Sequence, residues 1–236
     1  MITQNQFIDD INKLLLDKTV ISIYGASGTG KTTLSLQIVC SLLTKSYPYK
    51  DQCVWIQASE RFSKKRLSQM FEKEKNRLDY LIKNIFLIPS DGPCFSYYEQ
   101  SKIISNLYSD DFLLPPKVKF IVIDNVSHHL RFVLPKINEY VYYMEFINEF
   151  FSEQLYPLIM YCKRNQIKLI LIHELSYNPN IKKNVPFLHK LFSRINSLTI
   201  VLLRDFFNQE NKIFLKCNKN KWMFGYQLKD NGFIFI

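Results

Sequence analysis

Apolar residues along the chain form short unbroken runs that alternate with segments in which they recur every three or four positions. The short runs predict buried strands, and they cover residues 20–24, 53–57, 84–89, 118–124 and 168–173. The periodic segments predict amphipathic helices, and they cover residues 1–18, 31–44, 67–82, 96–108 and 138–165. Strands that alternate with helices are typical of an α/β fold with a parallel sheet.

The end of the chain has a different pattern. Further strands are predicted at 198–203, 212–217 and 226–236, with a tight turn at Asn231-Gly232 and no helix between them. We therefore expect one domain over residues 1–236, a P-loop NTPase of RecA type whose mostly parallel central sheet is flanked by helices. Residues 1–18 would form an N-terminal helix, and about 197–236 a β-rich extension of antiparallel strands.

Composition narrows the class of protein. The 236 residues are 47% apolar, which is enough for a sizeable core, and no apolar run is long enough to cross a bilayer. The N-terminus lacks a signal-peptide pattern, so we expect a cytoplasmic protein with buried, reduced cysteines. The net charge of +10 favours a polyanionic partner, of which nucleic acid is the usual one.

A complete phosphate-binding loop connects the first strand to the helix at 31–44. It has the pattern G-x-x-x-x-G-K-T, and its residues are Gly25, Ala26, Ser27, Gly28, Thr29, Gly30, Lys31 and Thr32. The glycines can take positive φ, and backbone N–H groups at the helix start would face the phosphates. Lys31 would reach the β- and γ-phosphates, Thr32 would bind Mg²⁺, and Thr33 would reach the α-phosphate. The pattern predicts that the protein binds ATP and Mg²⁺.

Asp124 ends the apolar run at 118–124, which is the Walker B pattern. The carboxyl ends of strands in an open α/β sheet line the ligand crevice, so Asp124 would face the loop and hold Mg²⁺ through water. The alternative is an aspartate that only forms the turn after a buried strand. The upstream loop favours the first interpretation, because it requires such a carboxylate.

Several segments resemble the RecA/RadA recombinases. Residues 24–38 resemble the family's phosphate loop and first helix, and 60–67 resemble a stretch that follows its second strand. Residues 123–127, followed by Leu130-Arg131, resemble the Walker B segment that leads into the first DNA-facing loop. The closing stretch 227–233 is similar to archaeal members. Size and layout are most similar to the short archaeal RadA paralogues known as RadB.

The resemblance implies a function in DNA repair and homologous recombination. It implies non-specific DNA contacts by Arg131 and, in the polar loop 176–185, by Lys182 and Lys183. It also implies a RadA-like recombinase or another repair protein as a partner, and a mediator role in which ATP orders the two loops. The sequence leaves the oligomeric state open.

The chain departs from the family at positions that matter for hydrolysis. The family's catalytic glutamate aligns with Ser59, and the nearest carboxylate is the neighbouring Glu60. The Asn-Gln pair after the fifth strand is replaced by His173-Glu174, and a glycine pair after the second DNA loop is absent around residues 188–190. We therefore expect weak ATPase activity and weak or no strand exchange, with Lys31, Glu60 and Glu174 as the candidate catalytic residues.

Two other classes of function remain. A regulatory P-loop ATPase with a protein partner would use the exposed surface of the first helix and of the aromatic-rich helix at 138–165. The aromatic residues of that long helix are expected to pack rather than to stack on bases; they are Tyr140, Tyr142, Tyr143, Phe146, Phe150 and Phe151. A small-molecule P-loop kinase would need a mobile arginine-bearing lid, and the sequence shows no compact one.

Overall fold

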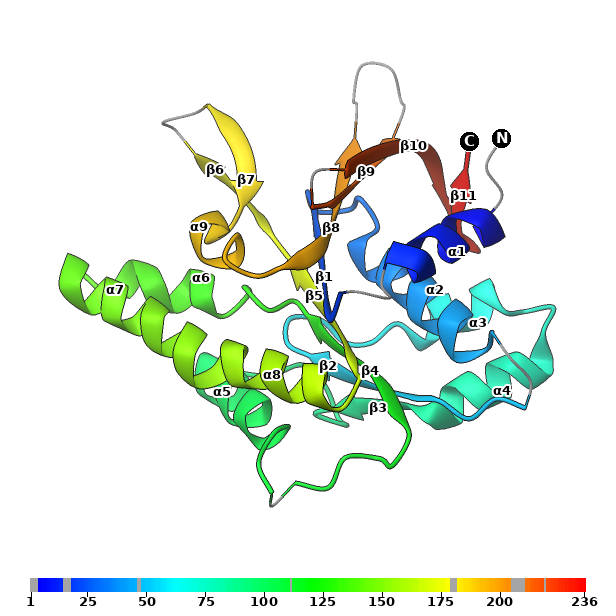
Figure 1. The fold of residues 1–236 in the computed structure, drawn as a ribbon, viewed down its shortest axis with the longest axis horizontal. Coiled ribbons are helices and arrows are strands. Elements are labelled where there is room, and N and C mark those ends of the chain that lie inside the picture. The colour runs from blue at the N-terminus through cyan, green and yellow to red at the C-terminus, as the bar shows by residue number, and fades with distance from the viewer. Residues whose placement is uncertain are drawn as a thin grey trace.

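The computed structural model describes residues 4–14, 18–45, 48–110, 112–178, 182–204, 211–218 and 220–236. Its helices and strands form one body with a twisted central sheet (Figure 1). None of the helices in these ranges is long and apolar enough to cross a membrane.

The central sheet has nine strands in the order β11-β10-β9-β8-β1-β5-β4-β2-β3. In chain order the bounds are β1 Val20–Gly25, β2 Gln52–Gln57, β3 Ile85–Ile88, β4 Val118–Asp124, β5 Lys168–His173, β8 Ser197–Arg204, β9 Asn211–Cys217, β10 Asn220–Lys229 and β11 Gly232–Phe235. The strands from β8 to β3 are parallel, whereas β9, β10 and β11 extend the sheet in antiparallel fashion. The expected architecture is therefore confirmed. Within the C-terminal region, however, β8 is a parallel neighbour of β1 and belongs to the main sheet.

Helices cover both faces of the sheet (Figure 1). One face packs against α1 Gln4–Leu14, α2 Lys31–Leu43, α3 Lys64–Met70 and α4 Lys75–Asn84. The other packs against α5 Tyr97–Asn106, α6 Leu130–Val133, α7 Tyr140–Glu149, α8 Tyr156–Arg164 and α9 His189–Phe192. Each layer has its own apolar cluster, and the inner strands contribute to both because successive side chains point to opposite faces.

Two predicted elements differ from the structure. The single helix expected at 67–82 is two helices, because the chain turns between Met70 and Lys75 and Phe71 is buried there against the sheet. The polar loop expected at 176–185 contains a two-stranded antiparallel hairpin, β6 Leu175–Asn178 with β7 Lys183–Pro186. This hairpin projects from the sheet edge above β5 (Figure 1).

The long aromatic segment is continuous and helical, as expected, with a π-helical stretch Phe150–Leu155 joining α7 to α8. Its aromatic side chains divide into two groups. Phe150 is fully buried, and Phe146 packs against Tyr97 with ring centroids 4.9 Å apart. Tyr140 and Tyr142 are 75% and 58% exposed, so the packing interpretation is wrong for these two.

The fold brings the carboxyl ends of β1, β4 and β5 together, since these strands are parallel neighbours in the order β1-β5-β4. The phosphate loop follows β1, Asp124 ends β4, and Glu174 follows β5. This edge of the sheet is where an open α/β fold places its ligand crevice.

Candidate functional site

The phosphate loop has the backbone that its glycines predict, with one difference. Gly28 and Gly30 have φ of 75° and 92°, in the left-handed region that favours glycine. Gly25 does not have positive φ. It is required because a Cβ there would lie 2.5 Å from the Thr29 hydroxyl oxygen, and that hydroxyl donates to the Ala26 carbonyl at 2.8 Å.

The C-terminal strands support the loop from behind. The Tyr226 hydroxyl donates to the Thr29 carbonyl at 2.9 Å, and the Tyr226 ring stacks on Phe233. A Cβ at Gly30 would lie 2.9 Å from the Phe233 ring. Gln37 on α2 accepts from the Phe233 N–H at 2.8 Å. These contacts were not predicted, because no pattern within the loop indicates that β10 and β11 pack beneath it.

Lys31 begins α2, and its ammonium group lies inside the loop. Nζ donates to the carbonyls of Gly25 and Ala26, at 2.9 and 3.0 Å. Burial lowers the pKa of Lys31, and the carboxylates of Asp124, Glu174 and Glu60 act against that shift. A cation held only by neutral carbonyls and distant carboxylates would gain from a bound phosphate.

Asp124 is buried beside the loop, and its Oδ2 accepts from the Thr32 hydroxyl at 2.8 Å. Burial raises the pKa of Asp124 to about 6; the Thr32 hydrogen bond and Lys31 oppose the shift, whereas Glu60 adds to it. A buried carboxylate next to a hydroxyl supplies the oxygen ligands that Mg²⁺ prefers. The residues present therefore fit the predicted Mg²⁺ ligands, Thr32 and Asp124.

Ser59 and Glu60 line the same cleft, on the opposite side of Asp124 from the loop. The N–H groups of Ala58 and Ser59 donate to the Asp124 carbonyl, at 2.8 and 2.9 Å, which fixes this turn against the Walker B strand. Ser59 is half-buried and Glu60 is exposed. Both residues line the cleft, and the catalytic role of Glu60 stays a prediction.

Glu174 is held by side chains of the segment that follows β4. Its carboxylate forms an ion pair with Arg131, accepts from the Asn125 amide at 2.7 Å and lies 3.5 Å from His128 Nδ1. Burial acts to raise the pKa of Glu174, but hydrogen bonds from Arg131 and Asn125 outweigh it, and the pKa is lowered. The negative charge of Glu174, which the sequence predicted to lie near the nucleotide phosphates, is thus already paired with Arg131 of the same chain.

His173, the other half of the substituted pair, faces the core. Its ring stacks on Tyr24 with centroids 4.4 Å apart and meets Phe192 edge-on. Burial lowers its pKa to about 3, so the imidazole is neutral. Only Glu174 of the two residues reaches the cleft.

The cleft that these residues enclose has a volume of about 610 Å³. Its lining combines the loop with the ends of three strands and the start of the hairpin: Gly25, Ala26, Ser27, Gly28, Gly30, Lys31, Thr32, Ser59, Glu60, Asp124, Asn125, His128, Arg131, Glu174, Leu175 and Asn184. Thr29 and Thr33 are not lining residues; both are buried, and their contacts to nucleotide stay predictions.

The predicted DNA-contact residues have different surroundings. Arg131 lies in the cleft, paired with Glu174, with its guanidinium carbon 5.8 Å from the centre of the Phe187 ring. Lys182 is exposed beside β7. The side chain of Lys183 lies outside the described part of the structure. Sequence reasoning missed Asn125 and His128, although both closely follow Asp124 and so belong to the same strand end.

Comparison with known proteins places this site in a class. The NB-ARC domain profile matches residues 4–87, which include the phosphate loop. No curated protein matches the chain. The sheet, the phosphate loop, the profile match and the solved structure described next together show a P-loop NTPase with a RecA-like fold.

One solved structure indicates the fold more closely. The crystal structure of the RadB recombinase is similar over 91% of this chain and 89% of that chain, with a TM-score of 0.65 and 19% identity. At this identity the likeness concerns the fold. It agrees with the resemblance of the phosphate loop and the Walker B segment to the same superfamily.

Proposed function

We propose that this protein is an ATP-binding, RadB-like ATPase that acts in DNA repair and homologous recombination, as a mediator of a RadA-like recombinase. It would bind DNA without sequence specificity and hydrolyse ATP weakly or in a DNA-dependent manner. The observation that carries the proposal is the composition of the cleft. It joins the phosphate loop to Arg131, in the segment after β4, and to the base of the β6–β7 hairpin.

Nucleotide binding would use the loop side of the cleft. Lys31 and the loop N–H groups would bind the phosphates, while Thr32 and Asp124 would hold Mg²⁺, which supplies charge neutralisation on the phosphate oxygens. Hydrolysis would be slow for two reasons. Ser59 offers no carboxylate to orient water, and Glu174 is engaged by Arg131 and Asn125. Glu60 is then the remaining candidate for that role.

DNA binding would use the two segments that border the cleft. A polyphosphate near Arg131 competes with Glu174 for the same guanidinium, so ATP could change how the segment after β4 and the hairpin are held. Lys182 and Lys183 would contact phosphates from the hairpin. We expect affinity for DNA to fall steeply with salt concentration. A cytoplasmic, nucleoid-associated location would follow from such binding.

The test is ATP turnover by the purified protein with and without single-stranded DNA, next to titrations of nucleotide binding and of DNA binding at low and high salt, with Lys31→Ala as the control. Turnover that DNA stimulates and that the variant lacks would support a working DNA-dependent ATPase. Tight ATP binding with negligible turnover, and DNA binding that depends on ATP, would support a nucleotide-gated mediator. Absence of DNA binding at low salt, both with and without ATP, would contradict the proposal.

A regulatory ATPase with a protein partner is the second candidate. It is favoured by neighbouring exposed apolar side chains on α7, where Tyr140, Val141 and Tyr142 are 75%, 61% and 58% exposed. The titration of DNA binding separates the two candidates. A protein partner predicts ATP binding without any salt-dependent affinity for DNA.

A further inference from the structure

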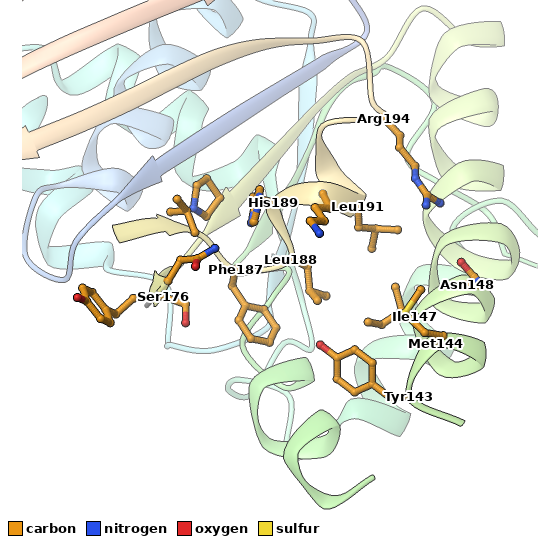
Figure 2. A pocket seen from close by; sticks show the side chains of 15 residues that line it. Tyr143, Met144, Ile147, Asn148, Ser176, Phe187, Leu188, His189, Leu191 and Arg194 are labelled. Carbon is orange, nitrogen blue, oxygen red and sulfur yellow. The ribbon is translucent and has the colours of Figure 1, made fainter. Parts of the chain in front are cut away.

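A second cavity, separate from the nucleotide cleft, lies between α7, the β6–β7 hairpin and α9 (Figure 2). Its volume is about 430 Å³, in the range of small-molecule sites. The two cavities share no lining residue. Leu175 and Asn184 of the hairpin border the nucleotide cleft, whereas Ser176 and Val185 border this second cavity. We call it the α7–hairpin groove.

The wall of the α7–hairpin groove is apolar on three sides. Ile147, Met144 and Tyr143 of α7 face Leu188 and Leu191 across the space, and Phe187 closes a third side (Figure 2). Most of these side chains are only partly exposed, so they already form a concave surface. Such a surface favours a ligand with a hydrocarbon or aromatic body.

The charged groups at the groove are all basic. Lys190 and Arg194 both line it and are exposed, and none of the described lining residues is acidic. Neither cation forms an ion pair with any residue that the structure describes. The Arg194 side chain, which follows α9, points toward the helix on the α7 side of the groove (Figure 2). An anionic group on the ligand would therefore meet two unpaired cations beside an apolar surface.

Leu188 adds an independent observation. Its φ is 54°, in the left-handed region that costs a non-glycine residue about 1–2 kcal/mol. The conformation is fixed by the turn into α9, where Leu191 and Phe192 donate to the Leu188 carbonyl at 2.9 and 3.1 Å. Glycine or asparagine would tolerate this backbone better. The strain is accompanied by an apolar side chain placed on the groove wall.

We propose that the α7–hairpin groove is a binding site for a small apolar anion, an aliphatic or aromatic carboxylate or sulfonate. The body would lie against Ile147, Leu188 and Leu191, with the anionic group near Lys190 and Arg194. A nucleic-acid base suits the groove less well. A base carries no negative charge to pair with Lys190 and Arg194, although Asn148 and Ser176 on the groove wall could pair with its edge groups.

The test uses the fluorescent sulfonate 8-anilinonaphthalene-1-sulfonate as probe, titrated into the folded protein at low salt with saturating Mg-ATP present. Saturating nucleotide prevents the probe from reporting on the cleft. The first variant, Lys190→Gln with Arg194→Gln, removes both cations and should raise the probe's Kd at least about fivefold. The matched control is Lys163→Gln with Arg164→Gln. These two exposed cations end the same long helical segment, at α8, and line no described part of the groove.

The second variant is Leu188→Asn. Asparagine accepts the left-handed backbone, so the turn should persist, while removal of the apolar side chain should weaken the probe about tenfold. Circular dichroism and thermal unfolding of each variant check that it is folded. The proposal is supported if the probe binds one saturable site, if both variants lower its affinity, and if the control variant leaves that affinity unchanged.

Three results would overturn it. Equal affinity in the wild type and both variants would place the probe elsewhere. Displacement of the probe by Mg-ATP, in a titration started without nucleotide, would place it in the nucleotide cleft. Stoichiometric displacement by a single-stranded oligonucleotide at low salt would assign the groove to nucleic acid.

Discussion

Two carboxylates of the nucleotide cleft have opposite surroundings. Asp124 is buried, accepts from one hydroxyl, and burial raises its pKa to about 6. Glu174 is less buried, is paired with Arg131 and accepts from Asn125, and these hydrogen bonds lower its pKa in spite of burial. Asp124 is the last residue of β4 and Glu174 directly follows β5, so both lie at the same edge of the sheet.

The difference separates two kinds of site. Asp124 lacks a direct cationic partner among the described residues, which is the condition of a carboxylate that is completed by a metal ion. The charge of Glu174 is already compensated within the chain, which is the condition of a structural or switching ion pair. Asp124 beside the phosphate loop thus has no cationic partner among the described residues, whereas Glu174 is already engaged by Arg131 and Asn125.

Loss of Lys31 should have the largest effect on ATP binding, because it removes the cation that lies within the phosphate loop. We expect Lys31→Ala to weaken ATP binding about 100-fold, since charged hydrogen bonds in a partly buried site contribute about 1.5–3 kcal/mol each. Isothermal titration calorimetry measures it. Lys64→Ala, an exposed lysine at the start of α3, is the control. Similar affinity of both variants would refute the role of the loop.

The pH dependence of stability should show the buried state of Asp124. Its pKa in the folded protein, about 6, lies above the unfolded value of about 3.9, so the folded state binds more protons between these values. Without nucleotide, the free energy of unfolding should therefore fall as pH rises through about 4–6, by about 2–3 kcal/mol. Urea unfolding at pH 4 and pH 7 measures this, with Asp124→Asn as the reference. Equal pH dependence of the two proteins would contradict it.

The pH dependence of stability that comes from Glu174 should have the opposite sign and be smaller. Its pKa is lowered in the folded protein, so its stabilisation is present above the unfolded pKa, about 4.3, and is lost as pH falls. Arg131 is 40% exposed, so solvent screening limits the coupling of the pair to about 1 kcal/mol. A double-mutant cycle with Glu174→Gln and Arg131→Gln measures it. Additive single effects would show that the pair is not coupled.

The smallest effect on ATP binding should come from the support behind the loop. Tyr226→Phe removes only the hydrogen bond to the Thr29 carbonyl and should cost about 1 kcal/mol of stability, with a two- to threefold loss of ATP affinity. Tyr98→Phe is the control, since that side chain is 75% exposed. Thermal unfolding and the same calorimetric titration give both numbers. An unchanged Tyr226→Phe variant would show that the loop holds its shape alone.

Much of the fold could be predicted because its strands are short apolar runs. The strands β1, β2, β3, β4 and β5 all lie where such runs predicted them. The break between α3 and α4 was not predictable, since no glycine or proline lies between Met70 and Lys75; burial of Phe71 and a hydrogen bond from the Glu74 N–H to the Phe71 carbonyl hold the turn. The β6–β7 hairpin was missed because its four-residue strands lack an apolar run.

The candidate site divides in the same way. The phosphate loop and Asp124 could be found because their chemistry is written in local spacing, as in G-x-x-x-x-G-K-T. The ion pair of Arg131 with Glu174 joins residues that are 43 positions apart, and no local pattern couples them. The stacking of His173 in the core, next to a glutamate in the cleft, follows from the alternation of side chains at a strand end.

By itself, the sequence determined that the chain forms a strand, a phosphate loop and a helix around Lys31, and that an α/β sheet carries an aspartate opposite to it. Steric and hydrogen-bonding rules act over a few residues, so they can be read locally. Only the tertiary structure decided which charges are free and which are paired, and which strands support the loop. Burial and electrostatic pairing depend on distance in space, and the order of the strands sets those distances.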